Sequence, residues 1–333
     1  MKPINTNMQK QMKAIEYTRY GAPDVLHLKD MPRPAPKSNE VLIRIRATTA
    51  TAADIMMRKG NPVIGRLYTG LKAPKRTILG FEFAGEVVET GEAVTLFEKG
   101  DKVFGGTTTL GCYAEYVCVS EDSVLTTMPE NITFTEAAPV NGSAITVMNF
   151  LKGLGNIQPG QHVLINGASG GLGTYAVQIA KHYGAEVTGV CSTRNIELVK
   201  SLGADHVIDY TQVDFTKSDM RYDIIFDTVG KRSFRESKKV LKEDGVFLAA
   251  VMDLPLLFHM IWSKITGGKK AKVSATGLLP VKERLNYFIE LKEMLRTSKI
   301  KTVIDATYPL SQVAAAHAYV ETGHKRGSII IAV

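Results

Sequence analysis

Residues 162–194 constrain this chain more than any other stretch. Their first apolar run, residues 163–165, is typical of a short buried strand, and it ends at the glycine-rich turn GASGGLG. Apolar residues then recur at helical spacing as far as Tyr183, and a second apolar run begins at Val187. This order predicts a strand, a tight turn, a helix and a second strand, which is the first half of a dinucleotide-binding fold.

The glycines of this turn suit a bound pyrophosphate. Gly167 and Gly170 allow the backbone to turn tightly and to approach the pyrophosphate without an intervening side chain. Gly173 allows the helix to pack closely on the strand, and the helix N-terminus presents N–H groups to the anion. A glycine-rich turn can also be a plain loop, but this one lies between a predicted strand and a predicted helix. The predicted contacts at the turn are Gly167, Ser169, Gly170, Gly171, Leu172 and Gly173.

The end of the second predicted strand indicates which dinucleotide binds. NAD sites usually place an acidic residue about 20 residues beyond the glycines to hold the ribose 2′-hydroxyl. This chain reads CSTRN over residues 191–195, with no acidic residue. A hydroxyl from Ser192 and a guanidinium from Arg194 suit a 2′-phosphate, although Arg194 could instead be a solvated residue at the start of the next helix. The sequence therefore favours NADP(H).

Composition and charge are those of an ordinary globular protein. The chain has 333 residues, of which 44% are hydrophobic and 22% charged, which leaves room for two domains. The formal net charge is +8, but basic residues are dense only at residues 238–239 and 269–272. Since no nucleic-acid motif accompanies them, we expect no nucleic-acid partner.

Cysteine usage and the lack of long apolar runs favour the cytoplasm. Cys112, Cys118 and Cys191 have no partners at zinc-ligand spacing, and their small, odd number indicates reduced thiols. The polar first residues lack the apolar core of a signal peptide, and the apolar stretch 254–262 is too short to span a bilayer. We expect a cytoplasmic protein without stable membrane association.

Two kinds of pattern divide the chain. Residues 1–130 contain short strand-like runs separated by glycine and proline turns. From residue 135 helical spacing appears, and predicted helices alternate with predicted strands as far as residue 251. This alternation predicts a parallel sheet. We therefore predict an α/β protein that contains a Rossmann-type doubly wound parallel sheet domain.

Five stretches carry a resemblance that covers nearly the whole chain. They are MKAIEYTRYGAPDVL, ILGFEFAGEVVETGEAVTLFEKGDKVFG, NGASGGLGTYAVQIAKHYGAEV, SLGADHVIDY and YPLSQVAAAHAYVETGHKRGSIIIAV. Through them the chain resembles the medium-chain dehydrogenase/reductase superfamily, in its branch of zinc-independent quinone oxidoreductases and enone/enoyl reductases. The resemblance implies a GroES-like catalytic domain from residues 1–136 and 278–333, and an inserted Rossmann NADP-binding domain from residues 137–277. It also implies an active site between the two domains, and a homodimer.

The chain departs from the zinc-dependent members at their metal positions. Those members carry a cysteine where Thr51 stands, and Gly-His-Glu where this chain has Gly80, Phe81 and Glu82. The four-cysteine lobe that binds structural zinc is also missing. Because zinc needs three or four nitrogen or sulfur ligands, we expect no zinc and no other metal site.

Without a metal, strong polarisation of a simple ketone is harder, so a substrate that spreads the developing negative charge is favoured. A conjugated carbonyl meets this need, since hydride can add at its β-carbon, which favours quinones and α,β-unsaturated carbonyls. The resemblance places Thr51 next to the nicotinamide, where its hydroxyl could orient the substrate oxygen or be an ordinary strand-end residue. Asp54 is expected to be a structural hydrogen-bond acceptor, and Tyr68 either a proton donor or a surface tyrosine. Thr51, Tyr68 and Asp54 are the candidate catalytic residues.

The resemblance also implies further cofactor contacts. Thr146 matches a threonine near the nicotinamide, unless it only packs a helix, and Tyr210 ends the third strand where a family tyrosine flanks the 2′-phosphate. Later strands of such sheets end at the edge where ligands bind. Lys325 precedes the final strand, where a solvated turn is the alternative. The remaining candidates at strand ends are Thr228, Gly230, Phe247 and Leu248.

Two other functions stay open. An enoyl-thioester reductase would use the same site, and its carrier's phosphates would suit the basic surface. A nucleotide-binding protein without turnover would keep only the cofactor site. The segment 253–272 is apolar and then basic, and we expect it to line a pocket or cover a dimer edge rather than to contact a membrane.

Overall fold

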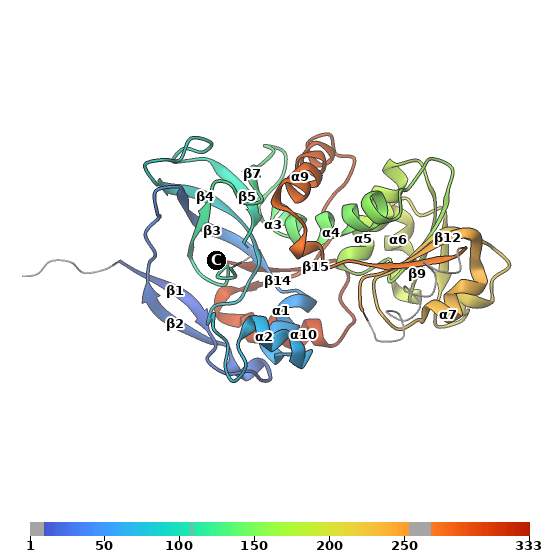
Figure 1. Cartoon of the computed structure of the whole chain (residues 1–333), viewed down its shortest axis with the longest axis horizontal. Coiled ribbons are helices and arrows are strands. Elements are labelled where there is room, and N and C mark those ends of the chain that lie inside the picture. Colours follow the sequence, from blue (N-terminus) through green and yellow to red (C-terminus); the bar gives the residue numbers. More distant parts are fainter. Residues whose placement is uncertain (1–9, 108, 253–267) are drawn as a thin grey trace, which may run out of the picture.

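The computed structural model describes residues 10–107, 109–252 and 268–333, except for the side chains of Ile64 and Tyr68. The chain forms two lobes, each built on its own sheet (Figure 1). Most of the segment 253–272 lies outside the described residues, and only its end, in β13 (Lys270–Val273), belongs to a described strand. No helix in the described part of the chain is long and apolar enough to cross a bilayer.

The first lobe is β-rich and joins strands from both ends of the chain. Its larger sheet has the order β14-β15-β3-β4-β5-β7, with β6 paired to β3, and β1 and β2 form a separate antiparallel pair. Its strands are β1 (Gln11–Glu16), β2 (His27–Pro32), β3 (Glu40–Thr49), β4 (Glu82–Thr90), β5 (Lys102–Gly106), β6 (Tyr116–Ser120), β7 (Leu125–Thr127), β14 (Ile304–Pro309) and β15 (Ser328–Ala332).

The second lobe contains a six-stranded sheet in which every pair is parallel. The strand order is β10-β9-β8-β11-β12-β13. Successive strands are added on one side of β8 as far as β10 and then on its other side from β11, as in doubly wound dinucleotide-binding folds. The predicted α/β fold with such a sheet is therefore confirmed. The strands other than β13 are β8 (His162–Asn166), β9 (Glu186–Cys191), β10 (His206–Asp209), β11 (Tyr222–Asp227) and β12 (Leu241–Ala249).

Helices cover both faces of this parallel sheet. The helices α5 (Gly171–His182) and α6 (Ile196–Ser201) share one buried cluster with one face, and α7 (Phe234–Ser237) packs on the other. The remaining helices are α1 (Ala52–Lys59), α2 (Arg66–Thr69), α3 (Phe134–Ala137), α4 (Ile145–Met148), α9 (Val281–Arg296) and α10 (Val313–Glu321).

The helical stretch that the sequence predicts after residue 135 is not one regular α-helix. Two π-helical turns, Val140–Ala144 and Asn149–Leu154, flank α4. Such turns are rare and occur frequently at functional sites. The first turn contains Gly142, where an added Cβ would lie 2.7 Å from the carboxylate of Glu82, so a contact from the other lobe shapes this segment.

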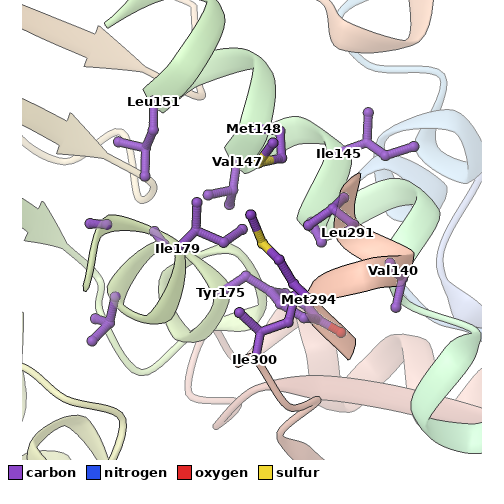
Figure 2. Close-up of a cluster of buried hydrophobic side chains, with 14 of the residues drawn as sticks. Val140, Ile145, Val147, Met148, Leu151, Tyr175, Ile179, Leu291, Met294 and Ile300 are labelled. Carbon is purple, nitrogen blue, oxygen red and sulfur yellow. The ribbon is translucent and has the colours of Figure 1, made fainter. Parts of the chain in front are cut away.

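Among the described residues, one hydrophobic cluster contains side chains of both lobes, and α9 contributes Phe288, Leu291 and Met294 to it. Phe288 packs on Phe104 of β5, with ring centroids 4.5 Å apart. Figure 2 shows Leu291 and Met294 of the same helix among side chains from α4 and α5. Each fully buried apolar side chain stabilises the fold by about 1.5–3 kcal/mol. The buried side chains of α9 therefore stabilise the packing of the two lobes against each other. The predicted domain limits at residues 136/137 and 277/278 stay a prediction.

Candidate active site

The glycine-rich turn after β8 requires glycine at two positions. Gly167 has φ +81°, and an added Cβ there would lie 2.5 Å from the hydroxyl oxygen of Thr228. A Cβ at Gly173 would lie 2.0 Å from the carbonyl oxygen of Gly167, so any larger residue would push α5 off the strand. At Gly170 a Cβ would meet only that same carbonyl oxygen, at 3.4 Å, which leaves space above the turn.

The first turn of α5 begins directly on these glycines. Gly171 is its first residue, and the N-cap residue Gly170 makes no side-chain cap. The N–H groups of a helix's first turn lack partners within the helix, and the dipole favours an anion there. Ser169 ties the turn to the residues after β9, because its hydroxyl accepts a hydrogen bond from Asn195 Nδ2 (2.9 Å). Leu172 is half-buried and packs against the core.

The segment before β15 lies on the same turn. The backbone N–H of Gly327 donates to the carbonyl of Ser169 (2.8 Å), and Gly170 and Gly327 form a single β-bridge. Lys325 Nζ donates to the carbonyl of Gly327 (2.8 Å) and lies 2.6 Å from where a Cβ of Gly171 would be. Burial lowers the pKa of Lys325 to about 8. A cationic group therefore lies beside the N-terminus of α5, and together they fit a pyrophosphate.

An open depression of ≈ 280 Å³ brings together three of the predicted residues, Ser192, Arg194 and Tyr210. Thr193 and His324 complete its lining, and neither was indicated by the sequence. Arg194 Nη2 donates to the carbonyl of His324 (2.7 Å), which fixes the guanidinium at the edge of the depression. A guanidinium and hydroxyl groups gathered in this way fit a phosphate monoester.

An acidic residue lies near this depression without lining it. Asp209, the last residue of β10, accepts a hydrogen bond from the Thr193 hydroxyl (2.5 Å) and two more from Thr211. These bonds, the one from Thr193 first, lower the pKa of Asp209. Its oxygens are therefore occupied by local donors.

Polar residues lie close together at the carboxyl ends of β8 and β11, the two neighbouring strands between which the strand order changes side. Asn166 Nδ2 donates to Asp227 Oδ1 (2.9 Å), and the N–H of Gly230 donates to the same carboxylate (3.2 Å). The Thr228 hydroxyl donates to the carbonyl of Asn166 (2.8 Å). Thr228 and Gly230 thus lie at the edge where such sheets bind ligands.

Phe247 and Leu248 do not join this group. Both side chains are fully buried on opposite faces of β12, Phe247 in the cluster with α7 and Leu248 in the cluster with α5. Side chains that alternate across a strand and fill its two faces cannot point along it toward the sheet edge. The prediction that they contact the cofactor therefore finds no support in their side-chain placement.

Thr51 and Asp54 form a capping box at the start of α1. The Thr51 hydroxyl donates to Asp54 Oδ2 (2.5 Å), and the Asp54 N–H donates to the Thr51 hydroxyl (3.2 Å). Asp54 is buried, and burial raises its pKa to about 6. Asp54 thus accepts hydrogen bonds, the role expected of it, while Thr51 is half-buried.

Two further candidates lie in helical segments. Thr146 is in α4, and its hydroxyl donates to the carbonyl of Gly142 in the π turn (2.6 Å). Tyr68 lies in α2, but its side chain is outside the described residues. Its role as a proton donor stays a prediction.

Glu82 is a buried acidic residue between the two lobes, and no role was predicted for it from the sequence. It begins β4 and is 2% exposed, and its carboxylate accepts hydrogen bonds from the Thr49 hydroxyl (2.5 Å) and from the Gly142 N–H (2.5 Å). Burial raises the pKa of Glu82 to about 7. The available signal was an acidic residue between two phenylalanines at the start of an apolar strand.

The residues at the family's zinc positions do not fit zinc. Thr51 and Phe81 offer no nitrogen or sulfur ligand. Within the described ranges, no group of three or more His, Cys, Asp and Glu residues is placed to hold a metal ion.

Comparisons with known proteins agree with this arrangement. Residues 37–130 match the family described as alcohol dehydrogenase GroES-like domain, and residues 202–331 match the one described as zinc-binding dehydrogenase. A chloroplastic quinone-oxidoreductase homolog of Spinacia oleracea is 33% identical over 336 residues, which cover 97% of this chain and 98% of the relative. The chain belongs to the medium-chain dehydrogenase/reductase superfamily.

Other members of this superfamily point to the same branch. A chloroplastic NADPH-dependent alkenal/one oxidoreductase of Arabidopsis thaliana is 32% identical over 342 residues, which cover 98% of this chain and 81% of the relative. A solved quinone oxidoreductase from Coxiella burnetii superposes with a TM-score of 0.86 at 32% identity, covering 97% of this chain and 100% of that one. The predicted membership in the quinone oxidoreductase and enone reductase branch is confirmed, and the β-rich lobe is the GroES-like part of the fold. Because these two plant relatives are named as chloroplastic, the cytoplasmic location stays a prediction.

Proposed function

We propose that this protein is an NADPH-dependent oxidoreductase that reduces quinones or α,β-unsaturated carbonyl compounds by hydride transfer, without zinc. One observation carries the proposal: two anion sites lie at one edge of the parallel sheet. The first is the N-terminus of α5 with Lys325, and the second is the depression around Arg194. Together they suit the pyrophosphate and the 2′-phosphate of a single NADP(H). The names of the relatives support the same reading.

Each part of the cofactor has residues of this chain to hold it. The backbone of the glycine turn and the Lys325 ammonium would hold the pyrophosphate. Ser192 and Arg194 would bind the 2′-phosphate, with Tyr210 beside it. The proposed contacts nearer the nicotinamide are Thr146, Thr228 and Gly230.

When bound, the cofactor supplies the hydride, so the protein must orient the substrate and stabilise the charge on its oxygen. Thr51 is the proposed group for this oxygen. Its hydroxyl proton is already shared with ionised Asp54, at 2.5 Å. To donate to the substrate oxygen, the Thr51 hydroxyl would have to give up this hydrogen bond to Asp54.

The proposed reaction needs no metal, because a conjugated carbonyl spreads the negative charge that hydride addition creates. The residues at the family's zinc positions fit this proposal, since Thr51 and Phe81 cannot ligate zinc. We therefore do not infer zinc binding from the description of the second matched family as zinc-binding dehydrogenase.

Three more features belong to the same proposal. The chain would act as a homodimer, since β13 ends the parallel sheet of the described residues and leaves an edge to pair. It would work in the cytoplasm without stable membrane association. Its catalytic domain would comprise residues 1–136 and 278–333, with the NADP-binding domain between them.

An assay of cofactor oxidation tests the proposal. NADPH and NADH would each be mixed with 1,4-quinones, enones and an enoyl-CoA, with and without a strong zinc chelator. Turnover of quinones or enones that prefers NADPH and resists the chelator is expected. Turnover of the enoyl-CoA alone would make the protein an enoyl-thioester reductase, and NADPH binding without turnover would contradict the proposed catalysis.

A further inference from the structure

Glu82 is buried where the two lobes meet. One carboxylate oxygen, Oε1, accepts from the Thr49 hydroxyl of β3 (2.5 Å), and the other, Oε2, accepts from the Gly142 N–H (2.5 Å). A buried carboxylate that is 2% exposed is costly unless its oxygens accept hydrogen bonds, and here each oxygen has a donor. Glu82 thus links the GroES-like sheet to the π turn Val140–Ala144.

This π turn leads directly to the proposed cofactor contacts. The Gly142 carbonyl accepts the hydrogen bond from the Thr146 hydroxyl (2.6 Å). Ser143 Oγ lies 3.8 Å from where a Cβ of Gly171, the first residue of α5, would be. The π turn therefore contacts Glu82 of β4 and lies close to the start of α5.

The fit between Glu82 and Gly142 leaves no spare room. A Cβ at Gly142 would lie 2.7 Å from Oε2 and 3.1 Å from Oε1. Gly142 does not have a positive φ, so its backbone conformation does not require glycine. Glycine is needed there because a side chain would collide with the Glu82 carboxylate. The side chain of Glu82 and the glycine opposite it act as one unit.

We propose that Glu82 is a positioning residue that holds the π turn Val140–Ala144, and with it Thr146, in the geometry that hydride transfer requires. It does so through its hydrogen bonds and touches neither substrate nor cofactor. The inference rests on the proposed reductase function, because it assigns to Glu82 the support of that same site.

Three variants separate the hydrogen bond to the turn from other effects. Glu82→Gln keeps an acceptor for the Gly142 N–H and can donate its amide to the Thr49 hydroxyl. Glu82→Ala removes both bonds. Thr49→Val is the matched control, because it removes a donor to the same carboxylate but leaves the contact with the turn.

For each variant we would measure kcat with saturating NADPH, KM for a quinone, and hydrogen exchange of residues 140–146. A misplacement of about 1 Å in a reacting group can cost roughly a hundredfold in rate, so kcat of Glu82→Ala should fall at least about tenfold while KM changes less than about threefold. Exchange of residues 140–146 should rise in this variant. Glu82→Gln and Thr49→Val should both keep kcat within about threefold of the unaltered protein.

Two results would overturn the inference. The first is a kcat of Glu82→Ala close to that of the unaltered protein, and the second is an equal loss of kcat in Thr49→Val or Glu82→Gln. If Glu82→Ala does not fold, Gly142→Ala tests the same contact from the other side and should lower kcat in the same way. Failure of the unaltered protein to reduce any quinone or enone would contradict the proposed function instead, and the exchange data would still decide whether Glu82 holds the turn.

Discussion

We propose that Arg194 distinguishes NADPH from NADH. Replacing it with alanine removes a guanidinium from the depression that also contains Ser192 and Tyr210. Since a hydrogen bond to a charged group contributes about 1.5–3 kcal/mol, KM for NADPH should rise roughly 10- to 100-fold. KM for NADH should stay unchanged.

Steady-state kinetics with both cofactors would check this prediction for Arg194→Ala. Arg221→Ala is a suitable control, because Arg221 is an exposed arginine that donates to the carbonyls of Ser218, Asp219 and Met220 instead. Equal losses of affinity for NADPH and NADH would show that Arg194 does not recognise the 2′-phosphate.

His317 should make the fold sensitive to acid. It is fully buried and lies between the Tyr113 hydroxyl (2.9 Å) and the Arg58 guanidinium (3.5 Å). Burial lowers its pKa to about 3 from an unfolded value of 6.5. Between these two pH values the unfolded chain binds a proton at this position and the folded chain does not, so stability falls as the pH falls.

The test for His317 compares urea unfolding of the unaltered protein and His317→Gln at pH 7 and pH 5. The loss of unfolding free energy on going to pH 5 should be smaller in the variant. Asp54 and Glu82 have raised pKa values and act in the opposite direction, but they are present in both proteins and cancel in the difference. Identical losses in both proteins would contradict the prediction.

At the scale of elements, the packing of α5 on β8 depends on Gly173. In Gly173→Ala the new Cβ would meet the Gly167 carbonyl oxygen at 2.0 Å, so the helix must shift. Overpacking of this kind typically costs about 1–3 kcal/mol, and the shift should also weaken NADPH binding because the anion site is the start of the same helix.

Thermal unfolding and NADPH titration would measure both effects of Gly173→Ala. Gly277→Ala is the matched control, since a Cβ there meets nothing within 4 Å. A variant that unfolds at the same temperature as the control and binds NADPH as tightly would refute the close packing.

The elements near the glycine turn could be predicted because their signals are local. The apolar runs and glycine spacing of residues 162–190 lie within one βαβ unit, and β8, α5 and β9 follow them. The π turns could not be predicted in this way, because one is shaped by Glu82, which lies 60 positions from Gly142. His324 was missed for the same reason, since it meets Arg194 from 130 positions away.

For Thr51 and Asp54, the same short sequence pattern is compatible with a helix cap and with a catalytic role. Thr51 and Asp54 have the three-residue spacing of a capping box, and the structure has that box. The resemblance to the family supplied their catalytic interpretation, and their role as a helix cap was not predicted. Phe247 was predicted from its place near a strand end, but alternation along β12 puts its side chain in the core.

At the level of the whole molecule, several contacts among the described residues join the two lobes. The cluster around α9 fixes the two sheets relative to each other, and the segment before β15 bonds to the glycine turn. Residues of both lobes, such as Lys325 and Gly171, therefore meet at the proposed cofactor site. The proposed binding of NADPH therefore needs both lobes, because neither lobe alone contains all of the proposed contacts.

In the proposed reaction, hydride passes from NADPH to the β-carbon of a conjugated carbonyl. The most direct measurement uses NADPH carrying deuterium at the transferred position, with an enone as substrate and a zinc chelator present, and locates the label by NMR. We expect one deuterium at the β-carbon of a saturated ketone. Deuterium at the carbonyl carbon of an allylic alcohol, or no labelled product, would contradict the proposed reaction.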